Sequence, residues 1–240
     1  MSKLTGVPFT YAANGKSYRG QLVDAPQSPP RAAIVLLPDW RGQSALALDH
    51  ARFFQHLGCC VVIGDLYGDG FSPTNPDDVG PMVRRLLDNR QEGVSALGAC
   101  VTALRRSLPA PCPVVCLGYS AGGMVVLDYG RSGADVAGLI TCSALLKTAD
   151  AGMGTRIAAP LLIIQGTEDQ VSPMVTIGEV IAEMDATKND ARFLLMSQTH
   201  HAFDNPEVGT DTSARLVYSA SSAARARAAI ESFVREVSDI

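Results

Sequence analysis

Short apolar runs alternate with amphipathic segments along most of this chain. Six runs rich in apolar and small residues cover 32–37, 59–65, 113–119, 136–142, 160–166 and 192–198. Runs of this kind are typical of strands that are buried on both faces of a parallel sheet. Between them, the spacing of apolar residues predicts helices over 44–57, 78–107, 122–131, 174–187 and 213–237. Alternating strands and helices favour an α/β fold, with helices on both faces of one sheet.

Two further segments, 7–13 and 18–24, precede this region and alternate apolar with polar residues. They are joined at Asn14-Gly15, a dipeptide that favours a tight turn, so they predict an antiparallel β-hairpin. Together the patterns predict a mostly parallel sheet of about eight strands with an N-terminal hairpin. The length of 240 residues fits one domain over 1–240.

Composition and charge limit the cellular compartments and the classes of partner that we expect for the protein. The chain is 47% hydrophobic and 18% charged, as in globular proteins, and no run approaches the roughly 18 apolar residues of a membrane span. The first residues contain no apolar secretion segment, so we expect a cytoplasmic protein without a membrane partner. A net charge of −4 without a basic block argues against a nucleic-acid partner. We expect a monomer or a small homo-oligomer.

Cysteines and histidines give no sign of a metal site. None of the six cysteines lies in a C-x-x-C pair or alternates with histidine at the spacing of metal ligands. In a reducing cytosol most of them are expected to be small buried hydrophobic residues. We therefore predict a protein without a metal or cofactor.

A serine in a glycine-flanked turn is the first candidate for chemistry. Residues 118–122, Gly-Tyr-Ser-Ala-Gly, match the G-x-S-x-G pattern and lie between an apolar strand and a predicted helix. In this setting a serine occupies a strained strand-to-helix turn with its hydroxyl pointing out of the sheet. The alternative is an ordinary turn with a serine N-cap. Because a cap alone does not require both Gly118 and Gly122, we interpret Ser120 as a nucleophile.

A serine nucleophile needs a base, and the chain has four histidines. His50 and His56 precede the serine in a predicted helix, where we expect surface or helix-end side chains. His200 and His201 directly follow the last predicted strand. Loops after parallel strands meet at one edge of the sheet, so one of these two is the expected base.

A carboxylate should orient that base, and in this fold it lies between the serine and the histidine along the chain. Glu168 and Asp169 follow the strand predicted over 160–166. We favour Asp169, and the alternative is that both are solvated loop acids.

The same edge should hold an oxyanion site and a substrate pocket. The backbone N–H of Ala121 is one expected oxyanion donor, and that of Trp40, in the loop after the first parallel strand, is the other. Arg41 is a candidate for a substrate carboxylate or a solvated surface residue. The aromatic residues expected to line the pocket are Trp40, Tyr67, Phe71, Tyr119 and Phe203.

The order of these motifs resembles that of the dienelactone hydrolase family of α/β-hydrolases, over nearly the whole chain. The resemblance rests on LLPDWRG, VVIGDLYG, GYSAGG, GTEDQVSP and HHAFDNP, followed by a C-terminal helix. The family places its catalytic histidine directly before a small residue and a phenylalanine, which selects His201. The resemblance also implies Ser120 as nucleophile and Asp169 as acid.

Four positions depart from the family pattern. The best-known members carry cysteine where this chain has Ser120. Arginines that help to hold a substrate carboxylate are replaced by Asp69 and Asn205, and Asp39 stands where the family uses glutamate. The resemblance therefore implies a cofactor-free serine hydrolase of small carboxylic esters or lactones. A thioesterase, an acyltransferase on the same residues and a non-catalytic ligand-binding relative remain as alternatives.

Overall fold

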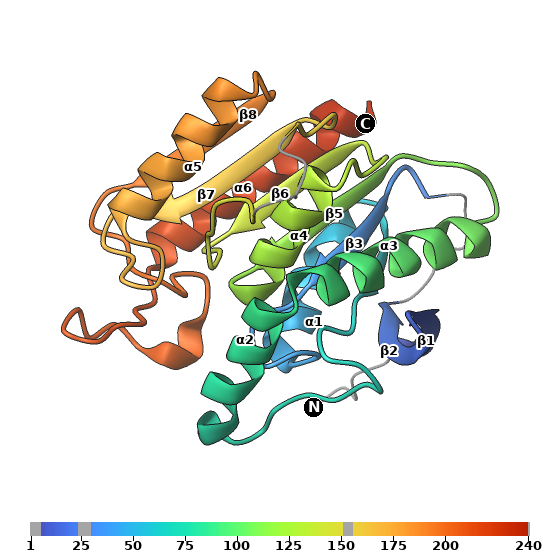
Figure 1. Ribbon diagram of the computed structural model, residues 1–240, viewed down its shortest axis with the longest axis horizontal. Helices are drawn as coiled ribbons and strands as arrows, with labels where there is room; N and C mark the ends of the chain where they lie inside the picture. Colours follow the sequence, from blue (N-terminus) through green and yellow to red (C-terminus); the bar gives the residue numbers. More distant parts are fainter. Residues whose placement is uncertain (1–5, 24–29, 151–155, 240) are drawn as a thin grey trace.

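The computed structural model describes residues 6–23, 30–150 and 156–239, which form an eight-stranded sheet flanked by helices (Figure 1). The strands are β1 (Gly6–Ala13), β2 (Lys16–Val23), β3 (Ala33–Leu37), β4 (Cys60–Ile63), β5 (Val114–Tyr119), β6 (Gly138–Cys142), β7 (Leu161–Gly166) and β8 (Ala191–Met196). Their order in the sheet is β1-β2-β4-β3-β5-β6-β7-β8. The predicted α/β-hydrolase fold is confirmed.

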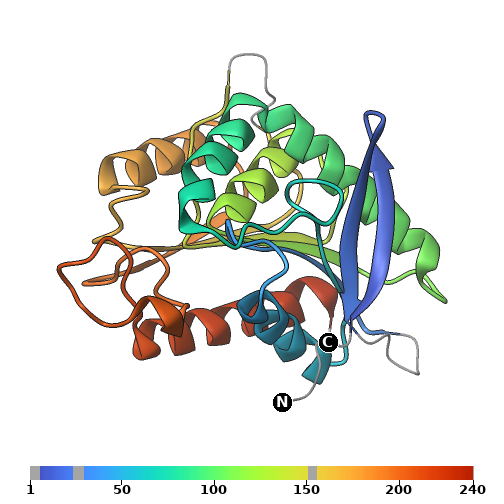
Figure 2. The same ribbon diagram turned by 90° about the horizontal axis from the view of Figure 1, so that it is seen from below.

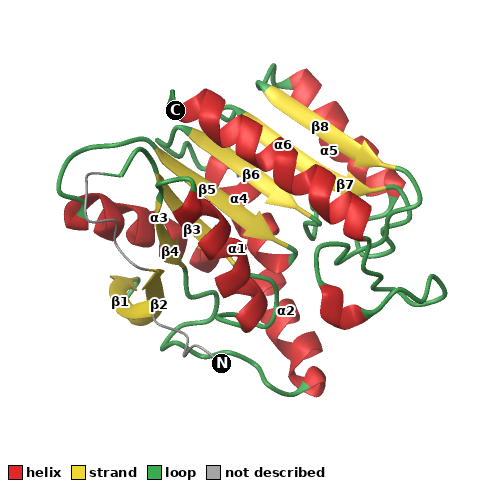
Figure 3. Cartoon of the chain, turned by 180° about the vertical axis from the view of Figure 1, so that it is seen from behind, coloured by secondary structure: helices red, strands yellow, loops and turns green. Residues whose placement is uncertain are grey.

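The parallel strands β3 to β8 carry the site, whereas β1 and β2 form the predicted antiparallel hairpin. β2 also pairs with β4 in antiparallel fashion. The last residue of the predicted hairpin, Asp24, lies outside the described residues. Strands β5 to β8 all point toward the edge where the loop segments over 197–219 lie (Figure 3).

The strand order reverses direction beside β3. The chain runs from β3 outward to β4 and then returns past β3 to β5, after which it continues to β8. Ligands bind in α/β sheets at such a reversal, outside the carboxyl ends of the strands. Leu37, at the end of β3, is in register with Gly118, so the Trp40 loop and Ser120 emerge side by side at this point.

Helices cover the sheet in two layers (Figure 2). They are α1 (Ala45–His56), α2 (Val79–Asp88), α3 (Arg90–Ser107), α4 (Ala121–Arg131), α5 (Met174–Ala186) and α6 (Ala220–Ser238). The core on one face takes buried residues from α3, α4 and α5, and that on the other face from α1 and α6. Within the described ranges, no helix combines the length and apolar composition that spanning a membrane requires.

The helix predicted over 78–107 is wrong, because the chain bends at Asn89. This residue has φ −132° and ψ 51°, which ends α2 and starts α3 in a new direction. Arg90 directly follows the bend, and its guanidinium makes a bidentate contact at 2.7 and 2.6 Å with the buried Asp128 of α4. This contact fixes α3 against α4 and leaves α2 free to extend over the carboxyl edge of the sheet.

The last helix also starts later than predicted, at Ala220 rather than residue 213. Residues before it run beside the loop that carries His201: Val217 donates to the His201 carbonyl at 3.1 Å, and Ser219 donates to the Phe203 carbonyl at 3.0 Å. The Ser219 side chain then caps α6 by accepting from the Ser222 N–H. Tertiary pairing of the backbone therefore overrides the helical pattern over 213–219.

Candidate active site

Ser120 stands in a strained turn between β5 and α4. Its φ of 48° and ψ of −115° lie outside the regions that ordinary residues prefer. A side chain at Gly118 would meet the Gly122 carbonyl, and one at Gly122 would meet the Pro38 carbonyl. Both glycines are therefore needed for the close approach of the turn to its neighbours, as the sequence pattern predicted.

Three side chains from distant parts of the sequence meet beside this turn. Ser120 Oγ lies 3.0 Å from His201 Nε2, and His201 Nδ1 lies 2.8 Å from Asp169 Oδ2. His201 and Asp169 are buried, whereas Ser120 is half-buried and faces a pocket. The hydroxyl, imidazole and carboxylate form one continuous hydrogen-bonded chain. Glu168 is exposed, and it is His201 rather than His200 that contacts the serine.

The Asp169 carboxylate is held by a set of donors that the sequence analysis missed. Its Oδ1 accepts from the backbone N–H groups of Val171 at 2.7 Å and Ser172 at 2.9 Å. Its Oδ2 accepts from Gln165 Nε2 at 3.2 Å in addition to its contact with His201. Gln165 is fully buried at the end of β7, and a lone polar residue in an apolar strand was the signal for it.

Ser143 is a second residue that the sequence analysis missed. It follows β6 with a positive φ of 47°, and its Oγ accepts from the Ala202 N–H at 2.8 Å. The same oxygen lies 3.4 Å from His201 Nδ1. Ser143 therefore ties the histidine loop to the end of the neighbouring strand and restricts the position of the imidazole.

The two expected oxyanion donors belong to segments that flank Ser120. Ala121 begins α4, and N–H groups in the first turn of a helix have no acceptor within that helix. Trp40 lies in the loop after β3, and Tyr67 Oη donates a hydrogen bond of 2.7 Å to its carbonyl. Trp40, Ala121 and Ser120 line the same pocket.

This pocket has a volume of about 760 Å³ and opens above the carboxyl ends of the parallel strands. Five of the predicted site residues besides Ser120 and His201 line it, namely Asp39, Trp40, Arg41, Tyr119 and Ala121. The lining also includes Asn205, Glu207 and several residues of α2, the helix that the bend at Asn89 sets apart.

Three aromatic residues were wrongly predicted to line the pocket. Among the described residues, Tyr67, Phe71 and Phe203 are not part of its wall. Tyr67 is buried behind Trp40, and Phe71 stands at the surface with its ring edge against Tyr67, 6.2 Å between centroids. Phe203 is fully buried in the core beside α6. The pattern located the right loops, but it could not give the direction of each ring.

Arg41 is already occupied by acidic partners. Its Nε donates to Asp39 Oδ1 at 3.3 Å and to Oδ2 at 3.1 Å, its Nη2 donates to Oδ2 at 2.8 Å, and its Nη1 contacts Glu207. Asn205 lines the pocket but uses its Oδ1 to accept from the Glu207 N–H at 3.0 Å. Arg41 therefore closes one wall by joining the loop after β3 to the loop after β8.

His50 is not the surface residue that the sequence analysis expected. It is buried, its ring stacks on Tyr119 at 4.1 Å between centroids, and its Nε2 lies 3.4 Å from Asp204 Oδ2. Burial lowers the pKa of His50 below 6.5 and raises the pKa of Asp204 above 3.8. His56, in contrast, is exposed at the end of α1.

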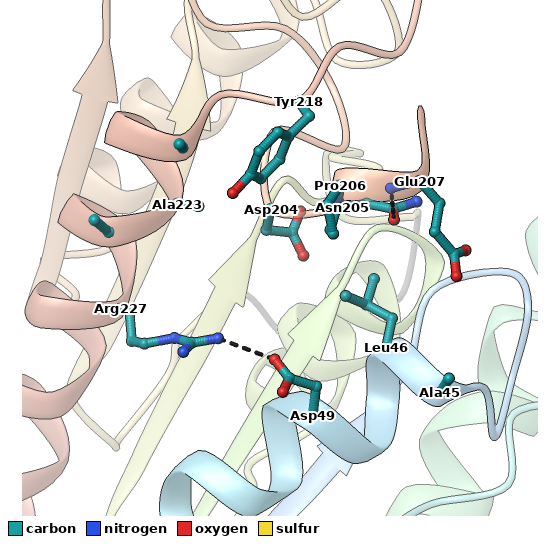
Figure 4. A pocket seen from close by; sticks show the side chains of 12 residues that line it. Ala45, Leu46, Asp49, Asp204, Asn205, Pro206, Glu207, Tyr218, Ala223 and Arg227 are labelled. Carbon is teal, nitrogen blue, oxygen red and sulfur yellow. Dashed lines mark hydrogen bonds and ion pairs between the residues drawn. The ribbon is translucent and has the colours of Figure 1, made fainter. Parts of the chain in front are cut away.

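A second pocket of about 460 Å³ lies between α1 and α6 and shares Asp204, Asn205 and Glu207 with the first (Figure 4). An ion pair of 3.3 Å between Asp49 and Arg227 joins α1 to α6 there (Figure 4). The segment over 204–207 is thus a common wall of two pockets, with Ser120 facing the larger one.

The chain over residues 20–238 matches the model of the dienelactone hydrolase family. The chain belongs to the dienelactone hydrolase family. Membership over most of the chain makes it a hydrolase of the dienelactone hydrolase type. No curated protein sequence matches the chain.

Solved structures agree with this fold. A dienelactone hydrolase-like promiscuous phosphotriesterase from metagenomic libraries is 24% identical, covering 97% of this chain and 98% of its own, with a TM-score of 0.89. An α/β serine hydrolase without a lid from Xanthomonas campestris is 14% identical over 98% and 96% of the two chains, with a TM-score of 0.61. A thermophilic esterase from Thermogutta terrifontis, bound to propionate, is 16% identical over 97% and 94%, with a TM-score of 0.61.

Proposed function

We propose that this dienelactone hydrolase family member hydrolyses carboxylic esters or lactones with Ser120 as nucleophile, His201 as general base and Asp169 as the group that orients the base. The observation that carries the proposal is the contact of 3.0 Å between Ser120 Oγ and His201 Nε2, with Asp169 on the other ring nitrogen. A serine hydroxyl is a weak nucleophile at neutral pH, and a base at hydrogen-bond distance removes that barrier.

The reaction follows from this arrangement. His201 Nε2 accepts the Ser120 proton as Oγ attacks the ester carbonyl, and the N–H groups of Ala121 and Trp40 stabilise the oxyanion. His201 then donates that proton to the departing alcohol oxygen, which leaves an acyl-enzyme on Ser120. Water attacks the acyl carbon, gives a proton to His201, and the acid leaves as Ser120 Oγ regains the proton. The Asp169 carboxylate stabilises the imidazolium in both steps.

The walls of the pocket favour esters other than dienelactone itself. The two positions where the family namesake uses arginine to hold a substrate carboxylate are Asp69 and Asn205 here. Arg41, the remaining basic residue beside Trp40, is paired with Asp39 and Glu207. A substrate carboxylate that pairs with Arg41 would have to displace Asp39 or Glu207, which costs binding free energy, whereas a neutral ester requires no such exchange.

A substrate panel tests the proposal. Wild type and Ser120→Ala are assayed in parallel on p-nitrophenyl acetate, a simple lactone, an acyl thioester and a phosphotriester. The last two cover the thioesterase alternative and the activity named for the similar metagenomic structure. We expect hydrolysis of the oxygen ester or lactone, and its loss in Ser120→Ala. Turnover in Ser120→Ala, no turnover of any carboxylic ester or lactone, or a clear preference for the thioester or phosphotriester would each overturn it.

A further inference from the structure

One helix forms an apolar wall of the Ser120 pocket. Val79, Val83 and Leu87 of α2 all line it, and they are spaced four residues apart. Residues at this spacing lie along one face of a helix, and at 1.5 Å per residue the row extends over about 12 Å. All three side chains are half-buried.

The next row of the same helix contains no apolar side chain. Gly80, Arg84 and Asp88 each follow one of the apolar residues, also line the pocket, and are exposed. α2 therefore turns an apolar row inward and a polar row toward the mouth of the pocket. The bend at Asn89 makes this possible, because it separates α2 from the packing of α3 on α4.

Two apolar residues from other loops complete this side of the pocket. Leu145 and Val171 line the pocket, and each lies two residues after a residue that contacts His201, Ser143 and Asp169 respectively. The Leu145 N–H donates to the Ser120 carbonyl at 2.9 Å, and the Val171 N–H donates to Asp169 at 2.7 Å. The apolar surface thus begins beside the nucleophile.

The side of the pocket that includes the loop after β3 and the loop after β8 carries ion-paired groups among apolar residues such as Trp40, Val208 and Leu216. Its lining includes the ion-paired Asp39, Arg41 and Glu207 together with Asn205. From this division we infer that the substrate ester carries a bulky apolar alkyl or aryl acyl group, which binds between Val79, Val83 and Leu87 of α2 and the pair Leu145 and Val171. The inference rests on the proposed function and narrows its substrate class.

The size of the pocket agrees with this inference. Pockets of roughly 300–1,000 Å³ enclose ligands of drug size, and this one has about 760 Å³. An acetyl group would leave the row on α2 without a partner. Burying each added methylene against that row should raise kcat/KM by up to about fourfold.

A chain-length series tests the inference. On p-nitrophenyl acetate, butyrate and hexanoate, kcat/KM of the wild type should rise by at least about tenfold from acetate to hexanoate. In Val83→Ser the ratio of hexanoate to acetate should fall by at least about fivefold, because a hydroxyl replaces part of the apolar row. Val7→Ser is the matched control: Val7 is an exposed valine on β1, and its ratio should equal that of the wild type.

A second variant keeps the test valid if Val83→Ser folds poorly. Val83→Phe fills the pocket with apolar volume, so the preferred ester should become shorter, from hexanoate to butyrate or acetate. A wild-type profile that is flat or falls with chain length, or a Val83→Ser ratio equal to that of Val7→Ser, would overturn the inference. Those results leave the proposed function intact as long as Ser120→Ala is inactive, whereas an active Ser120→Ala overturns the proposed function itself.

Discussion

Two histidine–aspartate pairs lie beside the turn that carries Ser120. His201 pairs with Asp169 at 2.8 Å and presents its other nitrogen to Ser120. His50 contacts Asp204 at 3.4 Å and its ring stacks on the ring of Tyr119, the residue before Ser120. The same residue types therefore occur twice, but only one imidazole reaches a hydroxyl that faces the pocket.

The surroundings of the two carboxylates differ as well. Asp169 accepts hydrogen bonds from two backbone N–H groups and from Gln165. Asp204 is largely buried, and burial raises its pKa and lowers that of His50. Burial thus favours the uncharged forms of the second pair. Several donors thus fix the carboxylate beside the proposed base, whereas the second pair packs against Tyr119.

The largest expected difference between the pairs is in catalysis. His201→Gln should lower kcat for p-nitrophenyl butyrate by at least about 10⁴-fold, because the general base is lost. His50→Gln is the matched control and should lower kcat by less than about tenfold, since His50 does not contact Ser120. Steady-state kinetics of both variants measures this difference. Equal losses in the two variants would remove the distinction between the pairs.

Replacing the two carboxylates should likewise have unequal effects on kcat, with the larger loss at Asp169. Asp169→Asn preserves the shape of the side chain but changes which ring nitrogen of His201 carries a proton, and it should lower kcat by about 10⁴-fold, as the same change does in the serine protease triad. Asp204→Asn should change kcat by less than about tenfold. Both variants are measured on one ester at saturating substrate. An Asp204→Asn loss as large as that of Asp169→Asn would mean that the second pair takes part in the reaction.

Removing the pair of His50 and Asp204 should change the free energy of unfolding and how that free energy depends on pH. At pH 7, His50→Phe should lower the free energy of unfolding by about 1–3 kcal/mol, because Asp204 loses its buried partner. The difference should shrink between pH 7 and pH 5. The pKa of His50 is lowered on folding, so the unfolded wild type binds the extra proton below pH 6.5 and the wild type loses stability.

His50 also holds the pKa of Asp204 down, so in His50→Phe folding raises that pKa further and the variant gains stability as pH falls. Both effects narrow the difference in stability between wild type and variant. Urea denaturation of wild type and His50→Phe at pH 7, 6 and 5 measures it. A gap that widens toward pH 5 would mean that the folded pair is charged, which is contrary to the packing role assigned here.

The smallest expected effect is that of a thiol reagent. Burial raises the pKa of Cys60 to about 11 and that of Cys100 to about 12, and it raises the pKa of Cys142 as well, so their thiolates are scarce at pH 8. Iodoacetamide should leave wild-type esterase activity within about twofold. Ser120→Cys places a thiol beside His201 and should be alkylated at residue 120, seen by mass spectrometry. Rapid inactivation of the wild type would point to a cysteine-dependent reaction.

The candidate site could be predicted from short sequence motifs combined with one rule of α/β folds, that the carboxyl ends of parallel strands lie at one edge of the sheet. Three motifs were enough to predict which side chains meet: the glycines around Ser120, Asp169 after β7 and His201 after β8. The strand positions followed from apolar runs alone. Each of these features depends on a few neighbouring residues.

Features that depend on tertiary partners could not be predicted. The bend at Asn89 follows from the contact of Arg90 with Asp128, and the late start of α6 follows from backbone pairing with the His201 loop. His50 resembled a surface residue in sequence because its partner Asp204 lies far along the chain. The apolar wall of α2 could not be predicted either, because it depends on the bend at Asn89 and so on the same tertiary contact.

Labelling with a fluorophosphonate, followed by mapping of the adduct by mass spectrometry, shows which residue is the nucleophile. We expect one adduct per chain, on Ser120, with labelling lost in Ser120→Ala and slowed strongly in His201→Gln but not in His50→Gln. An adduct on another residue, or an unlabelled Ser120 in a protein that hydrolyses esters, would contradict it.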